Sequence, residues 1–251
     1  MSSLISLGYK SCLADPDMWY HDAIKDDRAP YHEYLTIYVD DTLCVSKHPE
    51  HTMTEISKLY RLKDNSVSKP PTYLGASVTE YMLHGDNTKP HREFSSYKYV
   101  TDAVQTVEIE LSKVNKSLSS SISTPLSSGY RPKLDVTPQL PPEKATYFQN
   151  IIGILHWIAE LWRIDIHIHV AMLSSCLKAP REGHLLEVFH VFAYLKKCNR
   201  STMIFDDTLP MIDESLFTIA DWTEFSRDAK ELKPSNEPEP IGKPVNMYFF
   251  L

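Results

Sequence analysis

The residues with the clearest chemical potential are two adjacent carboxylates, Asp40 and Asp41, in the tetrapeptide Tyr38-Val39-Asp40-Asp41. Short apolar runs rich in β-branched and aromatic residues flank the tetrapeptide within residues 33–45, and each run predicts a strand. The acidic pair therefore falls at the tight turn of a hairpin. Such a turn points at least one carboxylate outward, and burying the pair is costly unless a cation neutralises it.

Paired carboxylates at a hairpin tip suit a hard divalent cation. Magnesium takes oxygen ligands from one or two carboxylates and fills its remaining positions with phosphates and water. The chemistry that this arrangement indicates is two-metal phosphoryl or nucleotidyl transfer. The alternative is that Asp40-Asp41 is only favourable turn chemistry between two strands. The tetrapeptide alone does not decide between these interpretations.

The elements after the hairpin combine helices and strands. A helix is predicted from Pro49 onward and a strand over residues 72–79. Residues 84–87 are a turn signal from which a second strand returns. An amphipathic helix is predicted over residues 100–111. The elements before this last helix form a β-α-β order with a trailing hairpin.

The second half of the chain is predicted to be mainly helical. Residues 113–142 are rich in Ser and Pro and predict a linker or extended arm. Apolar residues then recur at helical spacing in three segments, around residues 147–162, 166–177 and 185–195. From residue 207 the chain turns acidic and proline-bearing, and we expect residues 231–244 to be exposed and mobile.

Several short segments match a known family in order and spacing. The tetrapeptide corresponds to a metal-binding motif and Tyr73-Leu74-Gly75 to a motif that grips a primer end. The other matching segments are Leu7-Gly8-Tyr9-Lys10-Ser11, Asp15-Pro16-Asp17, Trp19-Tyr20, Ser96-Tyr97-Lys98-Tyr99-Val100, Ser123-Thr124-Pro125-Leu126, Tyr147-Phe148-Gln149-Asn150-Ile151-Ile152-Gly153 and Ala193-Tyr194-Leu195-Lys196-Lys197. Over residues 7–205 the chain thus resembles the reverse transcriptase of copia-type retrotransposons.

The resemblance implies an α+β fold with a partial polymerase palm, a catalytic β-hairpin, a helical thumb and a mainly helical connection region. The expected boundaries are a palm over residues 1–94, a thumb helix with a Ser/Pro-rich linker over 95–142, and the connection region over 143–206. Residues 207–251 would be an acidic tail that leads towards a missing ribonuclease H domain.

The resemblance also implies the chemistry of the hairpin, which is RNA-directed DNA polymerisation in the intact parent. Asp40 would be the principal ligand for two magnesium ions, with manganese as an alternative, and Asp41 a second acid beside them. The metals would activate the primer 3′-hydroxyl and neutralise the leaving pyrophosphate. Tyr38 and Val39 would lie under the primer terminus.

The implied partners follow from the same resemblance. Tyr73, Leu74 and Gly75 would hold the primer strand, with Gly75 allowing close approach of the backbone. The intact parent would act on an RNA template, a DNA primer and deoxynucleotides, together with the remainder of the Pol polyprotein. Its location would be intracellular, in a cytoplasmic virus-like particle.

Departures from the family pattern put catalysis by this chain in doubt. The family's first catalytic aspartate lies upstream of the region matched by Leu7, so we expect it and the fingers to be missing. The chain stops at Leu251, where the ribonuclease H domain would begin. Arg163-Ile164-Asp165-Ile166 also differs from the family's usual Arg-Pro-Asp-Ile. We therefore expect residues 1–251 alone not to polymerise DNA.

Composition limits the binding classes. The net charge of −7 argues against a generally basic nucleic-acid binder. Five cations lie around the expected thumb: Lys89, Arg92, Lys98, Lys113 and Lys116. They could form a local basic groove or an ordinary solvated helix face, and the sequence leaves both interpretations open.

The four cysteines lack metal-type spacing and predict reduced core residues of an intracellular protein. No signal peptide or membrane span is expected, and hence no membrane partner.

The histidines of the second half are expected to be structural. His167 and His169 could in principle be two arms of a zinc site, but alternate residues on a helix do not share a face. Trp157 and Trp162 are likewise expected in the core rather than on a platform for bases.

Two other functions stay open. The chain could be a non-catalytic retroelement remnant that binds nucleic acid or protein, with an affinity independent of magnesium and Asp40. It could also be an unrelated soluble α/β protein in which Asp40-Asp41 only caps a turn. A helix or loop at residues 34–45 would support that interpretation.

Overall fold

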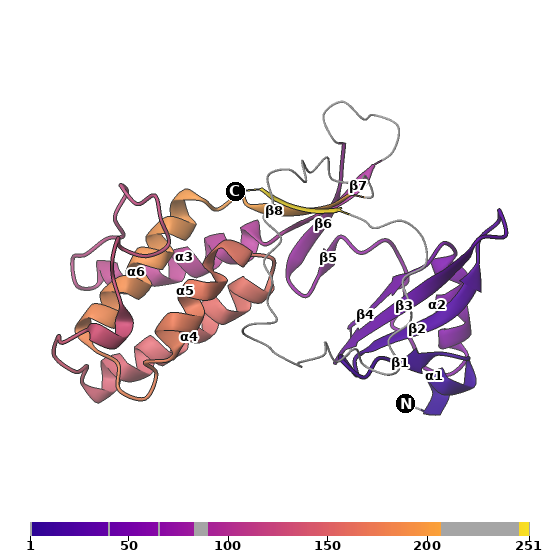
Figure 1. Cartoon of the computed structure of the whole chain (residues 1–251), viewed down its shortest axis with the longest axis horizontal. Helices are drawn as coiled ribbons and strands as arrows, with labels where there is room; N and C mark the ends of the chain where they lie inside the picture. Colours follow the sequence, from indigo (N-terminus) through magenta and orange to yellow (C-terminus); the bar gives the residue numbers. More distant parts are fainter. Residues whose placement is uncertain (1, 40, 65, 83–89, 207–245, 251) are drawn as a thin grey trace, which may run out of the picture. The chain divides into compact units, whose positions relative to one another are not determined.

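The computed structural model describes residues 2–39, 41–64, 66–82, 90–206 and 246–250, in which two antiparallel sheets and six α-helices are found (Figure 1). The fold of this part of the chain is therefore α+β. Its described residues form two compact units, which we call the N-terminal unit (residues 2–69) and the helical unit (residues 70–206 with 246–250).

The N-terminal unit is a four-stranded antiparallel sheet with two helices. Its elements are α1 (Ser2–Ser6), β1 (Lys10–Ser11), β2 (Met18–Ile24), β3 (Pro30–Tyr38), β4 (Asp41–Val45) and α2 (Pro49–Ser57). The strands follow one another in chain order across the sheet. Proline at the start of α2 fits a helix beginning, where its missing N–H costs no hydrogen bond. The helix predicted from Pro49 is confirmed.

One face of this sheet builds a small core. Because side chains alternate across a strand, Trp19 and its cross-strand partner Leu35 lie on the same face, and both are buried. Leu4, Tyr9 and Ile56 complete the cluster, so that α1 and α2 pack against this face. The opposite face carries Tyr20 and Tyr34, which are also paired across the strands.

The helical unit combines a five-stranded sheet with four helices. The strands are β5 (Thr72–Tyr73), β6 (Ala76–Tyr81), β7 (His91–Ser95), β8 (Thr202–Asp206) and β9 (Asn246–Phe250), and they are neighbours in this order. The helices are α3 (Tyr97–Ser112), α4 (Pro142–Glu160), α5 (Ile164–Ser174) and α6 (Glu182–Lys197). Figure 1 shows the four helices packed together, with β8 leading on from the end of α6.

The core of the helical unit comes from the apolar stripes predicted from the sequence. Val100, Val104 and Val107 of α3 are buried together with Phe148 and Leu155 of α4. The same cluster holds apolar residues of α5 and α6, namely Ile166, Val170, Leu173, Val188, Val191, Phe192 and Leu195. The predicted helices over residues 100–111, 147–162, 166–177 and 185–195 are thereby confirmed, each with shifted ends.

Residues 113–142 are not an extended arm, and that expectation is wrong. The segment has little regular structure beyond the 3₁₀ turn η1 (Pro132–Leu134), but Leu118, Leu126 and Leu140 are buried in the helical core. Burial of these leucines offsets the entropy cost of ordering an irregular chain. The many Ser and Pro residues of this segment therefore accompany irregular, turn-rich structure that packs on the helical core.

The units also differ in extent from the expected palm of residues 1–94. The structure separates residues 69 and 70, because β5, β6 and β7 pair with β8 rather than with the first sheet. The expected thumb and connection regions share one core. Most of the expected tail, residues 207–245, lies outside the described residues, whereas β9 pairs with β8. No helix of the described part is long and apolar enough to cross a membrane.

Candidate functional site

The hairpin predicted around the acidic pair is present. β3 and β4 are antiparallel, and Tyr38 is the partner of Asp41, so the chain reverses within the two residues between them. Residues 34–39 and 41–45 are therefore strand and turn. A helix or loop here would have supported the interpretation of the chain as an unrelated α/β protein. Asp40, the expected principal metal ligand, lies outside the described residues. Asp41 is exposed at the start of β4.

Val39 occupies an unusual backbone conformation at the tip of this hairpin. Its φ is +56°, and its side chain is 88% exposed. A β-branched residue in the left-handed region is strained, at a cost of about 1–3 kcal/mol, and such strain concentrates at functional sites. Because the exposed side chain gains little from packing, the tight turn itself holds Val39 in this conformation.

The base of the hairpin is held by Glu33, a residue that the sequence analysis did not single out. Its carboxylate accepts hydrogen bonds from four side chains: Tyr31 Oη of the same strand at 2.9 Å, Ser46 Oγ just after β4 at 2.5 Å, Tyr9 Oη before β1 at 3.4 Å and Thr52 Oγ1 of α2 at 3.5 Å. His21 Nδ1 lies 3.8 Å from the same carboxylate. Glu33 thus ties both hairpin strands to α2 and to β2.

Glu33 is ionised in this environment. Burial raises the pKa of its carboxyl, but the hydrogen bonds from Ser46 and Tyr31 and the nearby His21 outweigh burial, so the pKa lies below its ordinary value. A signal for this role does exist in the sequence. Glu33 has the same parity along the strand as Leu35, so an acid stands at an inward-facing position of an apolar strand.

The opposite face of the sheet carries aromatic and charged side chains. Lys10 Nζ lies 3.2 Å from Asp22 Oδ2 and 5.6 Å from the centroid of the Tyr20 ring. His32 Nδ1 lies 3.0 Å from Asp22 Oδ1, and the His32 ring packs edge-on against Tyr20 and Tyr34. This face therefore presents rings and one lysine beside the strand that ends at Tyr38.

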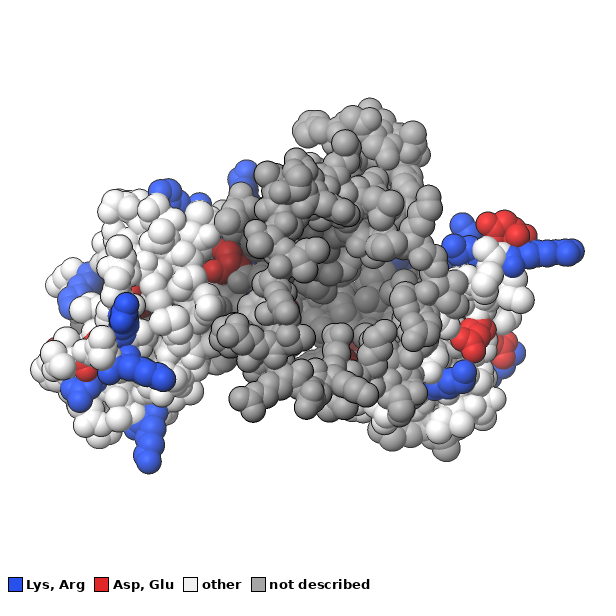
Figure 2. All heavy atoms as spheres, in the orientation of Figure 1, with Lys and Arg blue, Asp and Glu red and all other residues white. Residues whose placement is uncertain are grey.

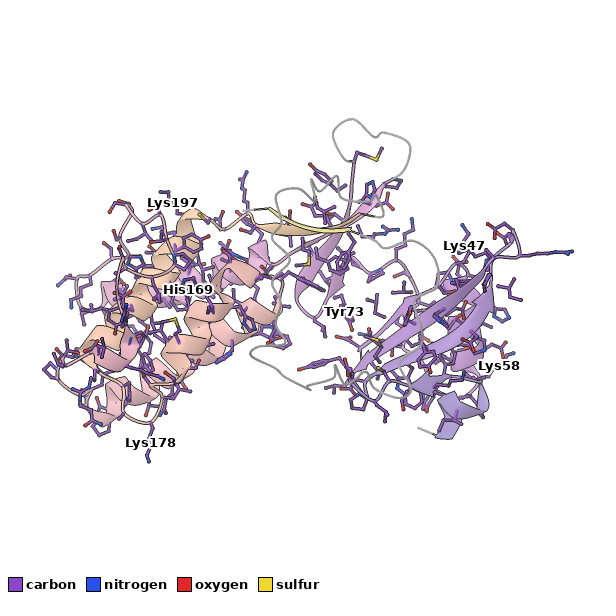
Figure 3. The ribbon with its side chains drawn as sticks, in the orientation of Figure 1. Lys47, Lys58, Tyr73, His169, Lys178 and Lys197 are labelled. Atoms are coloured by element: carbon purple, nitrogen blue, oxygen red, sulfur yellow. The ribbon has the colours of Figure 1, made fainter. Side chains whose placement is uncertain are left out.

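Tyr73-Leu74-Gly75 forms a second tight hairpin, in the helical unit. Tyr73, labelled in Figure 3, ends β5 and pairs with Ala76, and the two residues between them have φ values of +52° and +93°. Two positive φ values define the turn type that suits the twist of a two-residue hairpin. The single strand predicted over residues 72–79 is wrong, since this turn divides it.

Gly75 is explained by its turn conformation. A Cβ built on it would meet Leu161 Cδ1 at 3.7 Å, which is ordinary contact. The positive φ therefore requires glycine here more than close packing does. This hairpin and the Tyr38–Asp41 hairpin belong to different units.

The cations near the expected thumb do not gather into one groove. Arg92, Lys98 and Lys113 each pair with an acid, Glu80 at 2.9 Å, Asp102 at 2.7 Å and Glu110 at 2.6 Å respectively. Lys89 lies outside the described residues. On the face drawn in Figure 2, the blue side chains of the described residues stand in separate groups. A solvated helix face accounts for Lys98 and Lys113 on α3, whereas Arg92 is a paired cation on the strand β7.

The Arg163-Ile164-Asp165-Ile166 segment, which departs from the family form, holds a buried ion pair. Arg163 donates from Nε to Asp165 Oδ1 at 2.9 Å and from Nη2 to Asp165 Oδ2 at 2.7 Å. Tyr194 Oη of α6 donates to the same carboxylate at 2.9 Å. The ion pair therefore ties the start of α5 to α6. Trp162 is half-buried and packs against Phe94 and Phe205 outside the helical core cluster.

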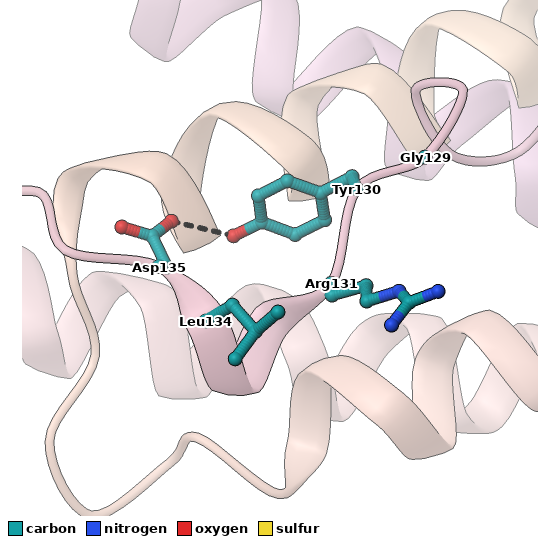
Figure 4. A pocket seen from close by; sticks show the side chains of 5 residues that line it. All are labelled: Gly129, Tyr130, Arg131, Leu134 and Asp135. Atoms are coloured by element: carbon teal, nitrogen blue, oxygen red, sulfur yellow. Dashed lines mark hydrogen bonds between the residues drawn. The ribbon is translucent and has the colours of Figure 1, made fainter.

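No group of three or more potential metal ligands occurs among the described residues, a set that does not include Asp40. A cavity of about 450 Å³ opens in the helical unit, lined by Gly129, Tyr130, Arg131, Leu134 and Asp135 (Figure 4). None of the site residues predicted from the sequence lines it. Tyr130 Oη donates to Asp135 Oδ2 at 2.6 Å, so the phenol and the carboxylate are already paired.

Comparison with known proteins gives one similarity. No family model matches the sequence, and no solved structure matches it. The chain is 31% identical over 166 residues to the transposon Ty5-1 protein YCL074W of Saccharomyces cerevisiae. The match covers 64% of this chain and 48% of the yeast protein, so the chain spans about half the length of the relative that it matches. The similarity supports a retrotransposon origin for the chain.

Proposed function

We propose that the chain is part of the RNA-directed DNA polymerase of a copia-type retrotransposon, and that its Tyr38–Asp41 hairpin is the metal-bearing element. The observation that carries this proposal is the tight hairpin in which Tyr38 pairs with Asp41 and a strained Val39 follows Tyr38. The sequence adds a second carboxylate, Asp40, next to Asp41. The order of the family's motifs along residues 7–205 and the similarity to a transposon protein support it.

Asp40 and Asp41 would hold divalent ions at the tip, as carboxylate oxygens are the ligands that magnesium and manganese accept. Bound there, the ions supply activation of a primer 3′-hydroxyl and neutralisation of the pyrophosphate that leaves. Tyr38 and Val39 would support the primer terminus by shape. Tyr73-Leu74-Gly75 would hold the primer strand at its own tight turn.

Polymerisation by this family needs a third carboxylate, which the hairpin does not contain. We therefore propose that residues 1–251 alone bind a primed template and a divalent ion without adding nucleotides. Incubation with a primed RNA template and deoxynucleotides should leave the primer unextended. Extension by the purified chain, lost in Asp40→Asn, would overturn this part of the proposal.

Ferrous ion offers a test of the metal position, because it replaces magnesium at oxygen-ligand sites. When hydrogen peroxide and ascorbate are added, it generates hydroxyl radicals that cleave nucleic acid close to where it is bound. With a primed RNA template, we expect cleavage centred on the primer 3′ end. The double variant Asp40→Asn/Asp41→Asn should abolish the cleavage.

The chain offers a matched control for this experiment. Asp26 and Asp27 are a second adjacent acidic pair, at the turn between β2 and β3. Asp26→Asn/Asp27→Asn should leave the cleavage unchanged. Duplex binding that persists without a divalent ion and in Asp40→Asn, with no localised cleavage, would instead support the non-catalytic remnant.

A further inference from the structure

The helix α5 carries apolar residues on its outer side as well as on its inner side. The inner side contributes buried residues to the helical core, namely Ile166, Val170 and Leu173. On the outer side Ile164, Ile168 and Met172 are 56%, 64% and 37% exposed. Because these three residues are spaced four apart, they lie above one another on one face of the helix. We call Ile164, Ile168 and Met172 the α5 stripe.

The exposed face that contains the α5 stripe lacks acidic and strongly basic residues. Among the described residues of α5, the others that are exposed are Ala171 and His167, so this face of the helix carries no lysine, arginine or carboxylate. His167 Nε2 lies 3.9 Å from Glu160 Oε1 at the end of α4. The carboxylate of Glu160 therefore stands beside His167 at the edge of the face rather than on the stripe.

Exposed aliphatic residues on the neighbouring helices α3 and α6 stand alone. Ile109 of α3 is exposed, but the residues one turn away on either side, Gln105 and Lys113, are polar. Leu186 of α6 is exposed, and Glu182 precedes it by one turn. Single exposed apolar residues are ordinary on protein surfaces, whereas a contiguous apolar face marks an interaction site. Of these helices, α5 therefore offers the face suited to a partner.

The inner side of α5 holds the stripe at the surface. Arg163 and Tyr194 both donate hydrogen bonds to the carboxylate of Asp165 in the first turn of α5. A rotation of α5 that buried the stripe would break these hydrogen bonds and would expose Val170 and Leu173, which are buried in the core. The stripe is therefore presented on a helix with a fixed orientation in its unit.

We propose that a second copy of this chain covers the α5 stripe, through antiparallel packing of α5 against α5 about a twofold axis at Ile168. The spacing of the stripe is symmetric about Ile168, with one apolar residue four positions before it and another four positions after it. In an antiparallel pair, Ile168 meets its own copy and Ile164 meets the partner's Met172. A twofold interface requires such a self-complementary patch.

Charge favours a second copy over a nucleic acid at this face. The formal net charge of the chain is −7, so two copies repel each other in general and can approach best where a face is uncharged. A nucleic acid needs lysine or arginine to neutralise its phosphates, and the exposed residues of α5 include neither. The contact is one helix wide, which makes a small interface and hence a weak dimer.

Sedimentation equilibrium of the full chain between about 10 μM and about 1 mM tests the dimer, since weak interfaces associate in this range. The mass should rise from 28.8 kDa towards twice that value. Ile168→Glu should raise the dissociation constant by about tenfold or more, because it sets two carboxylates against each other at the axis. Ile109→Glu on α3 is the matched control and should leave the dimer unchanged.

Two results of this experiment would overturn the proposal. A dimer that persists unweakened in Ile168→Glu would lie on another face. A chain that stays at 28.8 kDa at every concentration would assign the α5 stripe to a different partner, such as the remainder of a parent polyprotein.

Methyl spectra of the unmodified chain give a second measurement that does not depend on how the variants fold. The methyl signals of Ile164, Ile168 and Met172 should shift as the concentration rises, whereas those of Ile109 and Leu186 should not. Signals of the α5 stripe that stay constant with concentration would overturn the proposal even if the mass rises.

Discussion

Val39 illustrates how one residue at the tip of the hairpin is set by the turn rather than by packing. The positive φ of a β-branched residue costs free energy that its exposed side chain cannot recover. Val39→Gly should therefore stabilise the chain by about 0.5–1 kcal/mol, the relief of strain being partly offset by the flexibility of glycine. Urea unfolding measures the change.

Val45 provides the control for this prediction. It is 56% exposed in β4, where its backbone is extended, so Val45→Gly should destabilise by about 0.5–1 kcal/mol. A loss of stability in both glycine variants would show that Val39 is not strained.

Glu33 gives the hairpin a defined pH dependence. Its folded-state pKa is depressed below the ordinary value of 4.5, so its stabilising effect is present above that pH and is lost as the pH falls through the folded-state pKa. At neutral pH, Glu33→Gln should cost about 1–2 kcal/mol, because the charged acceptor for several buried donors is gone. The cost should shrink in acid.

Unfolding curves at neutral and acidic pH measure this effect. Glu55→Gln is the matched control, since the pair of Glu55 with Lys58 lies at the surface and the substitution should change stability little at either pH. A pH-independent cost for Glu33→Gln would mean that shape rather than charge makes Glu33 important.

At the level of single residues, the residue types predicted the Tyr38–Asp41 hairpin but not Glu33, which stabilises its base. Aromatic and β-branched runs around an acidic pair suffice to place a turn, and the register Tyr38 to Asp41 agrees. The role of Glu33 depends on donors such as Tyr9, Ser46 and Thr52, which are distant in sequence and meet Glu33 only after the chain folds. Parity along β3 could have drawn attention to it.

At the level of secondary-structure elements, the helical glycines Gly153 and Gly183 differ in whether a larger side chain would fit. Gly153 in α4 has open space where a Cβ would stand, whereas a Cβ on Gly183 in α6 would come within 1.9 Å of Asp135. Gly153→Ala should stabilise by about 0.5–1 kcal/mol, from higher helix propensity. Gly183→Ala should instead destabilise by about 1–3 kcal/mol, because the segment that carries Asp135 must move.

Thermal unfolding of the two alanine variants checks this contrast. Equal stabilisation in both would show that the contact of Asp135 with α6 is loose.

Helices were predicted better than irregular segments for a physical reason. An apolar stripe repeated over three or more turns leaves few alternatives, as in α3 and α4. Residues 113–142 contain isolated leucines without a period, and their burial depends on partners far along the chain. The strand over residues 72–79 was divided because Leu74 adopts a positive φ, which its type does not favour.

The described residues contain two separate hydrophobic clusters, one in each unit. Leu35 is fully buried in the N-terminal unit and Phe148 in the helical unit. Calorimetry should resolve two transitions, with Leu35→Ala lowering one and Phe148→Ala the other, at costs of about 2–5 and 3–5 kcal/mol. A single transition lowered by both variants would contradict independent cores.

The boundary between these units could not be predicted from the chain alone. The pairing of β7 with β8 joins segments separated by the whole helical region, and neither strand carries a signal for its partner. A boundary at residue 94 followed from the resemblance, whereas the pairing places β5, β6 and β7 with the helices.

The central claim is that the Tyr38–Asp41 hairpin binds a divalent ion, and paramagnetic broadening by manganese tests it most directly. With a primed RNA template present, the account predicts that Mn²⁺ broadens the amide signals of Val39, Asp41 and Thr42 first, and that Asp40→Asn removes the effect. Broadening that is as strong at the Asp26-Asp27 turn, or unchanged in Asp40→Asn, would contradict it, because the acidic pair would then be turn chemistry alone.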